Sequence, residues 1–394
     1  MGRVFIDVTQ SCRSSNNSGI QVVTRNLFRE ISSLYNVTPI IWDNHLRKYA
    51  KLNSKELKNL SNPFSGTYNP RPRPNKQENP IYIELISSVL RCRRFVSLDK
   101  KPKKEDLLVL PEVFRDKRVF FISRSTHPTM PKAGIFYDAN VLRDPLNTPK
   151  SRLKNFNNYL QCLSNCEAIS CISEDSRKTF EDLDKKNALQ KRIEVHPLPV
   201  TPPPTSYSSL KPSSVPLVLC VSTLGYNKNH ICLLEAAEKL WKEGRNFKLE
   251  LVGQADPSWT PKVLDEINRL AARGRMIKWL MHVDQDTLEE KYSDCSFTIY
   301  PSLFEGYGLP VLESLIRKKP CICGKNGALG EVSQGGGCLT LENQKDPEQL
   351  AQAIRQLLAN TSLLKSLAEE AGNRNFITWK SYAKNLFSFF QNQN

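Results

Sequence analysis

The sequence YPSLFEGYGLPVLESL occupies residues 300–315 and indicates the end of a strand, a loop and a helix in succession. The apolar residues 297–300 predict a buried strand, and the Pro-Ser pair that follows predicts a turn. Pro310 fits the first turn of the helix, where its missing N–H group costs nothing. The amides of residues 306–309 are therefore expected at the positive end of a helix, which suits a phosphate.

Two glutamates accompany this helix end. Glu305 lies in the loop, and Glu313 lies about one turn into the helix. A carboxylate does not bind a phosphate, but it accepts hydrogen bonds from sugar hydroxyls. The combination suggests a sugar nucleotide. From these residue types alone, an ordinary strand, loop and helix with both glutamates in solvent is an equal alternative.

The segment EGYGLPVLE resembles the E-x7-E signature of retaining glycosyltransferases of family 4, the glycosyl transferases of group 1. It is similar to bacterial mannosyl- and rhamnosyl-type transferases of surface polysaccharide synthesis. The resemblance implies an α/β chain with the GT-B fold, in which two Rossmann-like domains face each other across a cleft. It covers most of residues 200–390 and is weaker over residues 1–200.

A linker rich in proline and serine, residues 197–216, separates two regular patterns. We expect an N-terminal, acceptor-side Rossmann-like domain at residues 1–200 and a C-terminal, nucleotide-sugar-binding one at residues 201–375. By resemblance, residues 376–394 form a terminal helix that crosses back to the N-terminal domain. Residues 44–104 show neither the helical nor the strand period, which predicts a basic loop or insertion.

Short apolar runs at residues 107–110, 119–123 and 133–137 predict consecutive strands of a parallel sheet in the N-terminal domain. The chain just after such strands lines the ligand crevice of an open α/β sheet. The acceptor-side candidates chosen on this ground are Glu112, His127, Tyr137, Asp138 and Asn140. In the family a histidine often precedes the aspartate, but this chain has Tyr137 there. A catalytic histidine is therefore not carried over, and Asp138 remains the candidate for orienting the acceptor hydroxyl or taking its proton.

GYNKNHICLLEAA, residues 225–237, resembles the family segment in which two basic residues meet the donor diphosphate. Here Asn227 stands at the first basic position and only Lys228 remains. A further arginine of the family is also missing, since Thr223 and its neighbour stand in its place. The resemblance then implies that Lys228 carries most of the leaving-group charge by electrostatic catalysis. A solvated lysine at a helix start is the alternative.

The resemblance implies catalytic roles for Glu305, Lys228 and Asp138, with Glu305 bonded to the donor sugar and Glu313 to the ribose. Gly19, in the loop before the first helix, is implied to let the backbone approach the phosphates, although a turn glycine is the alternative. Val283 belongs to the turn that is implied to hold the base. The implied donor-binding residues are Gly19, Thr223, Asn227, Lys228, Val283, Gly306, Tyr307, Gly308, Leu309 and Glu313.

The net charge of +16 is concentrated in the first half of the chain. Residues 1–200 carry 34 basic and 20 acidic residues, whereas residues 201–394 carry 22 and 20. Residues 47–104 alone carry 15 basic and 4 acidic residues. The imbalance predicts an acidic partner, and we favour peripheral contact with an anionic membrane through residues 47–104 over nucleic acid, for which no recognition module is present.

The 11 cysteines predict buried free thiols in a reducing cytosol, because several lie inside apolar runs. Those in apolar runs are Cys171, Cys220, Cys321 and Cys323. The pairs Cys162/Cys166 and Cys321/Cys323 lack a matching second pair or nearby histidines, so no metal is expected. No apolar run is long enough to cross a bilayer. We expect a cytoplasmic protein, with peripheral contact at the inner face of the membrane.

The resemblance thus implies a retaining, metal-independent glycosyltransferase that moves a hexose from a nucleotide-diphosphate sugar to a glycan or lipid-linked acceptor. No cofactor is expected, and a GDP-hexose is preferred over uracil- and thymine-linked donors. Two alternatives stay open. A sugar-nucleotide-binding pseudoenzyme with the same fold is suggested by the basic residues missing near Thr223 and Asn227. A nucleic-acid-binding protein is suggested by the basic segment.

Overall fold

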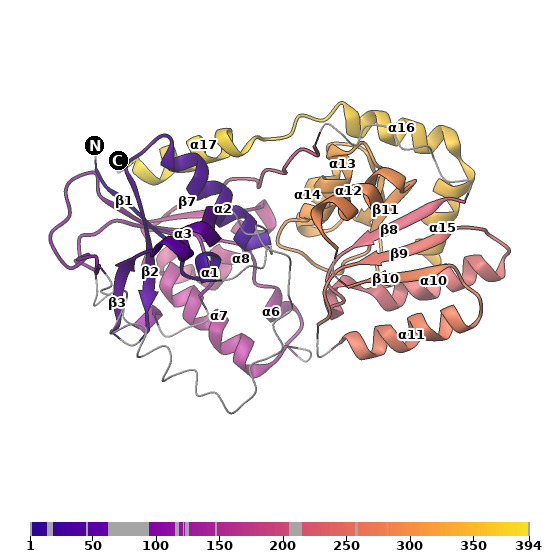
Figure 1. Ribbon diagram of the computed structural model, residues 1–394, viewed down its shortest axis with the longest axis horizontal. Helices are drawn as coiled ribbons and strands as arrows, with labels where there is room; N and C mark the ends of the chain where they lie inside the picture. Colours follow the sequence, from indigo (N-terminus) through magenta and orange to yellow (C-terminus); the bar gives the residue numbers. More distant parts are fainter. Residues whose placement is uncertain are drawn as a thin grey trace. The chain divides into compact units, whose positions relative to one another are not determined.

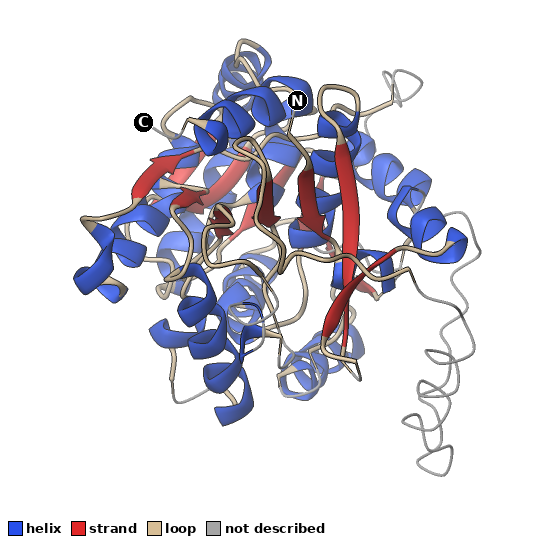
Figure 2. Cartoon of the chain, turned by 90° about the vertical axis from the view of Figure 1, so that its left-hand side faces the viewer, coloured by secondary structure: helices blue, strands red, loops and turns tan. Residues whose placement is uncertain are grey.

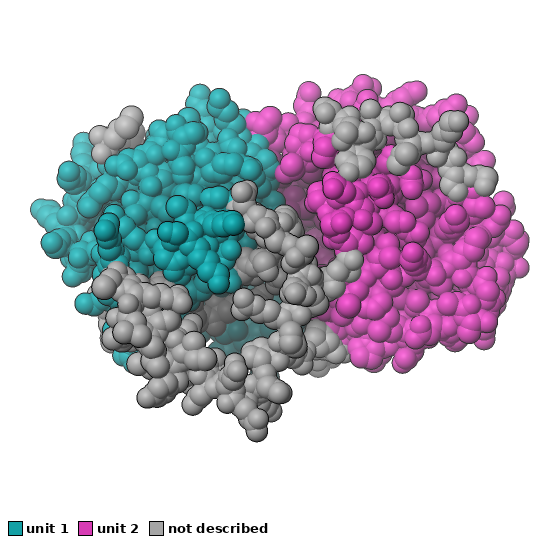
Figure 3. Space-filling view, in the orientation of Figure 1, with its two compact units in different colours: residues 1–172, 176–197, 379–394 teal, residues 173–175, 198–378 magenta. Residues whose placement is uncertain are grey.

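The computed structural model contains two compact units (Figure 3). It describes residues 2–13, 19–44, 46–61, 94–114, 118–120, 122, 126–145, 148–204, 215–256, 259–281 and 283–392. The first unit comprises Met1–Ile172, Ser176–Pro197 and Trp379–Asn394. The second unit comprises Ser173–Asp175 and Leu198–Thr378.

The described part of the first unit is built on a seven-stranded sheet in the order β3-β2-β1-β4-β5-β6-β7. The strands are β1 Val4–Asp7, β2 Val37–Asp43, β3 Lys48–Lys51, β4 Leu107–Leu110, β5 Lys132–Phe136, β6 Ala168–Cys171 and β7 Arg192–Val195. Neighbouring strands run parallel except β3, which pairs antiparallel with β2. Most strands are buried throughout because helices cover both faces of the sheet (Figure 2).

The helices of the first unit include one from the far end of the chain. They are α1 Thr9–Arg13, α2 Gly19–Ser32, α3 Ser54–Ser61, α6 Asn140–Arg143, α7 Lys150–Leu163, α8 Glu174–Leu183, α9 Lys185–Ala188 and α17 Trp379–Gln391, with the first two residues of α8 counted in the second unit. α17 packs on α2 (Figure 1). The ring of Phe387 stacks on that of Tyr35 at 5.3 Å between centroids. The aromatic side chains of α17 are therefore core residues of the first unit.

The structure differs from the sequence-based expectations at two places in the first unit. The prediction of a strand at residues 119–123 was wrong, because the described residues Val119, Phe120 and Ile122 are helical. The side chains of Val119 and Ile122 fill the core beside β4 and β5. Within residues 44–104, β3 and α3 are regular elements. A reciprocal cap starts α3, since Asn53 and Glu56 each accept the other's backbone N–H at 2.9 Å. Residues 62–93 of this segment lie outside the described residues.

The described part of the second unit contains a parallel six-stranded sheet in the order β10-β9-β8-β11-β12-β13. The strands are β8 Leu217–Val221, β9 Lys248–Val252, β10 Ile277–Leu280, β11 Phe297–Tyr300, β12 Cys321–Gly324 and β13 Cys338–Leu341. The sequence analysis missed β13, in which two residues are partly buried, Thr340 is exposed and only Leu341 is buried. This order is that of a doubly wound dinucleotide-type fold.

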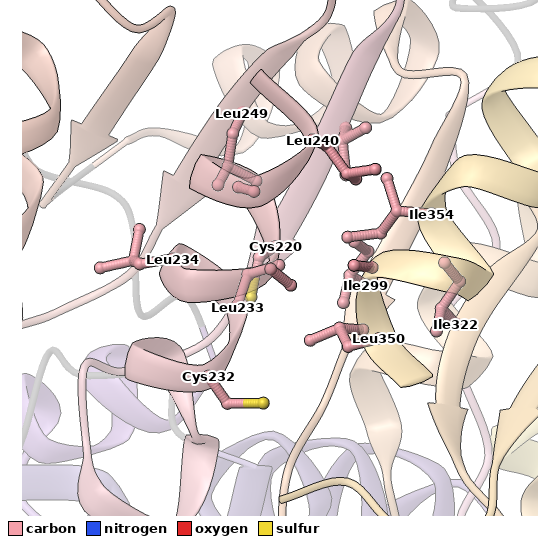
Figure 4. Close-up of a cluster of buried hydrophobic side chains, with 14 of the residues drawn as sticks. Cys220, Cys232, Leu233, Leu234, Leu240, Leu249, Ile299, Ile322, Leu350 and Ile354 are labelled. Atoms are coloured by element: carbon pink, nitrogen blue, oxygen red, sulfur yellow. The ribbon is translucent and has the colours of Figure 1, made fainter. Parts of the chain in front are cut away.

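Helices cover this sheet and bury its apolar side chains. They are η2 Tyr226–Lys228, α10 His230–Lys242, α11 Thr260–Ala272, α12 Gln285–Asp294, α13 Leu309–Ile316, α14 Gly327–Ser333, α15 Pro347–Ala359 and α16 Thr361–Gly372. Leu350 and Ile354 of α15 point toward Ile299 of β11, and α15 packs against α10 (Figure 4). Burying each such aliphatic side chain contributes about 1.5–3 kcal/mol, so this core holds the strands whose ends carry the candidate site.

The thiols that lie in apolar runs are buried, as the sequence predicted. Cys171, Cys220, Cys321 and Cys323 are free and fully buried. Among the described residues, none of the helices combines the length and apolarity that crossing a bilayer requires. Within the same ranges, no three side chains of His, Cys, Asp or Glu gather in a way that could hold a metal ion.

Candidate functional site

The candidate site lies in the second unit, at the point between the parallel strands β8 and β11 where the strand order reverses. β8 is followed by β9 on one side, and β11 is followed by β12 on the other. The loops that leave the carboxyl ends of β8 and β11 therefore flank the reversal point, which is where open α/β sheets bind ligands. These loops are residues 222–229 and 301–308.

The loop after β8 is fixed onto the loop after β11 by backbone contacts. The carbonyl oxygen of Asn227 accepts the N–H of Leu303 at 2.7 Å and the hydroxyl of Ser302 at 2.8 Å. Asn229 adopts a left-handed conformation (φ 58°), which asparagine tolerates. Its side-chain amide donates to the carbonyls of Pro301 at 3.3 Å and Gln344 at 2.6 Å. Asn227, predicted from resemblance as a donor contact, thus holds the two loops in register.

Lys228 and Glu305 meet at the centre of these loops. The ammonium of Lys228 donates to Oε1 of Glu305, and their side chains are 18% and 11% exposed. The same ammonium donates to the hydroxyl of Tyr300 at 2.8 Å, and this hydroxyl donates to Oε1 of Glu305 at 2.9 Å. The hydroxyl of Ser302 also lies within hydrogen-bond distance of this oxygen, and it shares its one proton between Glu305 and the Asn227 carbonyl. A cation, a carboxylate and two hydroxyls therefore form one connected network.

The two carboxylate oxygens of Glu305 differ in their hydrogen-bond partners. Oε1 accepts from Lys228, Tyr300 and Ser302, and Asn227 approaches it at 3.4 Å. Among the residues that the structure describes, none donates to Oε2. A carboxylate held through one oxygen has a fixed direction, and its second oxygen can accept a hydroxyl of a ligand.

The amino end of α13 supplies free amides beside this network. Gly308 is the N-cap of α13 with φ 114°, and a Cβ there would lie 2.8 Å from the side chain of Leu329, so the position requires glycine. Pro310 occupies the first turn. Among the described residues, none accepts a hydrogen bond from the N–H of Gly308 or Leu309. Such a helix end attracts an anion through its amides and its dipole.

The neighbouring residues Gly306 and Tyr307 complete this loop. The carbonyl of Gly306 accepts the hydroxyl of Ser173, a residue of the same unit, at 2.8 Å. Tyr307 packs partly buried against the cluster of Val311 and Leu329, and burial raises the pKa of its hydroxyl to about 12. Both residues therefore support the shape of the loop.

Glu313 lies one turn into α13, with its side chain directed to the neighbouring helix α12. Oε2 of Glu313 accepts the hydroxyl of Tyr292 at 3.3 Å. Burial raises the pKa of Glu313, while Arg317 and the Tyr292 hydroxyl oppose the rise. Val283 lies between β10 and α12 and packs partly buried against Leu217 and Val252. Thr223 is exposed just after β8.

Gly19 and Asp138 belong to the first unit, and their predicted roles stay predictions. Gly19 is the first residue of α2. Asp138 follows β5, and its Oδ1 accepts the N–H of Asn140 at 2.9 Å. Of the other acceptor-side candidates, Glu112 is buried with its carboxylate on the N–H groups of Gln10 and Ser11, both at 2.7 Å.

Two further acceptor-side candidates have structural contacts of their own in the first unit. The hydroxyl of Tyr137 donates to the carbonyl of Pro111 at 2.7 Å inside the core. The ring of His127 contacts the hydroxyl of Thr129 at 2.9 Å. These contacts stabilise the loops after β4 and β5.

Sequence reasoning gave no role to Tyr300 or Ser302, although both stand in the stretch that carries the signature. Tyr300 is the last residue of β11, and its ring lies 5.2 Å from the ammonium of Lys228. Burial, together with Glu305, raises the pKa of the Tyr300 hydroxyl well above its usual range, so it stays protonated and can donate. A polar group at the carboxyl end of a central buried strand was the available signal.

His230 lies directly behind Lys228 at the start of α10. It is fully buried, and its Nε2 contacts the hydroxyl of Ser222 at 3.0 Å. Burial, assisted by the charge of Lys228, lowers the pKa of His230 to about 3. The imidazole is therefore neutral at neutral pH and does not act as a cation at the site.

Acidification is expected to destabilise the protein through His230. The unfolded chain takes up a proton near pH 6.5 and the folded chain only near pH 3, so stability is lost as the pH falls through this window. Between pH 7 and pH 5 the loss from this residue is about 2 kcal/mol. Urea denaturation of the wild type and of His230→Gln at both pH values measures it. Equal losses in the two proteins would contradict the assignment.

The fold of the two units is that of the GT-B glycosyltransferases. Sucrose-phosphate synthase from Thermosynechococcus elongatus superposes with a TM-score of 0.68 at 13% identity, covering 99% of this chain and 98% of that one. At this identity the likeness concerns the fold alone. The α/β, GT-B architecture predicted from the sequence is confirmed.

Residues 205–374, most of the second unit, match the family described as Glycosyl transferases group 1. The serotype-specific mannosyltransferase WbdA of Escherichia coli is 26% identical over 270 residues, 64% of this chain and 32% of that protein. The O-antigen chain mannosyltransferase B of Escherichia coli is 26% identical over 224 residues, 54% of this chain and 57% of that protein. This chain thus spans about a third of the length of WbdA. The predicted enzyme class, a glycosyltransferase, agrees with the matched family and with the names of these relatives.

Proposed function

We propose that this chain transfers a hexose from a nucleotide-diphosphate sugar to a glycan or lipid-linked acceptor, with retention of the anomeric configuration. Because WbdA and the O-antigen chain enzyme are mannosyltransferases, we propose mannose as the sugar and a polysaccharide as the product. GDP is the nucleotide that we favour. The observation that carries the proposal is the contact of Lys228 with Glu305 beside the amino end of α13.

The chemistry follows from charge placement. In the transfer, the bond between the anomeric carbon and the phosphate oxygen breaks, and its electron pair leaves with the diphosphate. The ammonium of Lys228 and the amides of Gly308 and Leu309 stabilise this negative charge in a site that is largely shielded from water. These groups supply the positive charge that a metal ion provides elsewhere, and the proposed metal independence rests on them.

The carboxylates bind the neutral parts of the donor. Oε2 of Glu305 accepts hydroxyls of the sugar, and Glu313 accepts hydroxyls of the ribose. The acceptor oxygen attacks the face that the diphosphate leaves, and its proton passes to the departing phosphate oxygen. A double displacement needs a carboxylate against the opposite face of the sugar, and we assign no residue to that role. Asp138 orients the acceptor hydroxyl in this proposal.

Residues 47–104 are proposed to contact an anionic membrane peripherally. In the described part of this segment the exposed lysines Lys48, Lys51, Lys55 and Lys58 supply positive charge. The contact stays a prediction, and co-sedimentation with anionic vesicles measures it.

Nucleotide-diphosphate sugars are expected to stabilise the protein against heat. A donor present at about 100 times its dissociation constant adds about 2.7 kcal/mol, which raises the melting temperature by roughly 5 °C or more. A thermal-shift panel of GDP-, UDP- and dTDP-hexoses identifies the donor, and the strongest shift is expected with GDP-mannose. Transfer to a mannan acceptor in EDTA then tests metal independence.

Two outcomes separate the competing functions. Stabilisation by a donor without hydrolysis or transfer would favour a sugar-nucleotide-binding pseudoenzyme. The absence of any shift across the panel, with a folded protein, would overturn the proposed function.

A further inference from the structure

Helix α12 contacts the α13 segment through a row of polar side chains. Gln285, Glu289 and Tyr292 are spaced four and three residues apart, so they lie on one face of α12. Their partners are Glu313 of α13 and Arg317, the C-cap of α13, which are also one turn apart. The two rows join the helices through side chains rather than through apolar packing alone.

The contact between Glu289 and Arg317 is the rigid part of this row. Arg317 makes a two-pronged contact with Glu289, at 2.7 Å from Nε to Oε2 and 2.5 Å to Oε1, and the side chains are 10% and 2% exposed. Gln285 donates to the same carboxylate at 2.8 Å. Buried pairs of this kind contribute little net stability but fix geometry.

Arg317 also fixes the ring of Tyr292. The guanidinium carbon lies 4.6 Å from the ring centroid, which is a favourable cation–π distance. A third guanidinium N–H donates to the backbone carbonyl of Glu313 at 2.7 Å. The ring of Tyr292 is 1% exposed, so its hydroxyl has one direction, toward Oε2 of Glu313 at 3.3 Å. Burial and the charge of Glu313 raise the pKa of this hydroxyl well above its usual range, so it stays a donor.

We propose that Tyr292 is a positioning residue that sets the direction of the Glu313 carboxylate toward the ribose of the donor, and that the Arg317–Glu289 pair holds Tyr292 in place. The inference rests on the proposed function, since it takes Glu313 as the ribose ligand. Val283, the predicted base contact, directly precedes Asp284, which is the N-cap of α12. The same helix thus carries Tyr292 and starts beside the predicted base contact, so in this proposal one rigid element positions the groups for the base and for the ribose.

Tyr292→Phe removes the hydroxyl and keeps the ring. The donor KM and the dissociation constant of the nucleoside diphosphate are expected to rise about three- to tenfold, because one hydrogen bond to a charged group is lost. kcat is expected to stay within about twofold, because the chemistry lies at the sugar end of the donor. Steady-state kinetics with the donor and calorimetric titration of the nucleoside diphosphate measure these values.

A double variant distinguishes an effect of Tyr292 that acts through Glu313 from a general destabilisation of the packing between α12 and α13. Glu313→Gln is expected to weaken donor binding more than Tyr292→Phe, and adding Tyr292→Phe to it is expected to change nothing further. The matched control is Tyr159→Phe. Tyr159 is a buried tyrosine of the first unit, and its hydroxyl donates to a backbone carbonyl, so its loss is expected to leave donor affinity unchanged. Additive effects of the two substitutions would overturn the proposal.

Arg317→Lys is a second route to the same test, since it keeps the charge and loses the two-pronged contact with Glu289. It is expected to raise the donor KM with kcat preserved, and an unchanged KM would overturn the role of the pair. If the wild type binds no nucleoside diphosphate, the proposed function fails. If the wild type binds, Glu313→Gln weakens binding and Tyr292→Phe does not, only the positioning role fails.

Discussion

Lys228→Ala is expected to lower kcat/KM for sugar transfer by about 100- to 1,000-fold, because removing one preorganised donor of positive charge typically costs this much. The ammonium of Lys228 contacts Tyr300 and Glu305 in a site where both charged side chains are less than one-fifth exposed. Its loss also leaves the carboxylate of Glu305 without its counter-charge. Initial rates at saturating and at low donor measure the effect.

The control for this variant is another lysine of the same unit. Lys239 on α10 pairs with Glu348 at the surface, and both side chains are about half exposed. Lys239→Ala is expected to keep wild-type activity. A Lys228→Ala protein that retains a third of the wild-type activity would refute the assignment.

Nucleotide affinities separate a direct role of Lys228 from an indirect one. If its ammonium meets the diphosphate, Lys228→Ala weakens binding of the nucleoside diphosphate and leaves the free nucleoside unaffected. A parallel loss of affinity for both would mean that the variant distorts the loops after β8 and β11.

Arg118→Met is expected to cost the first unit about 3–5 kcal/mol of unfolding free energy, because it leaves a buried carboxylate without its cation. Arg118 and Asp7 have fully buried side chains, and NH1 lies 2.7 and 2.8 Å from the two carboxylate oxygens. The hydroxyls of Tyr49 and Thr9 also donate to Asp7, so the carboxylate joins β3 and α1 to the end of β1. Native-state hydrogen exchange at the amides of β1 and β4 measures the unfolding free energy of the first unit separately from that of the second unit.

Two companion variants test the mechanism of that loss. Asp7→Asn combined with Arg118→Met is expected to be less destabilised than the sum of the single variants, since neither charge remains. Lys185→Ala breaks an exposed pair with Asp182 and is expected to leave exchange unchanged. Additive losses in the double variant would mean that the two residues stabilise the unit independently.

Part of the candidate site could be predicted because its residues are neighbours in the chain. Glu305, the glycines of the loop and Pro310 lie in one short segment, and strand, loop and helix signals follow one another there. The amino end of α13 therefore stood where the sequence placed it. The reciprocal cap of Asn53 and Glu56 is an equally local signal of a helix start. The absence of helical or strand periodicity over the whole segment led to the prediction of a loop there instead.

The helical residues around Val119 show where such signals fail. A short apolar run does not distinguish a buried strand from a buried helical turn, because both hide every side chain. The sheet passes directly from β4 to β5, so the core around them, and not the run itself, selected the helical form.

The alternation of apolar runs, the glycines and the two glutamates were sufficient to specify two doubly wound units and the loop that carries the candidate site, because each of these features is local in the chain. The tertiary structure alone decided which side chains meet. Lys228 and Glu305 are 77 residues apart and Arg317 and Glu289 are 28 apart, and each pair forms only because the strand order brings their loops or helices together. The physical reason is that contacts between elements depend on how complete helices and strands pack, and no local period in a sequence records that packing.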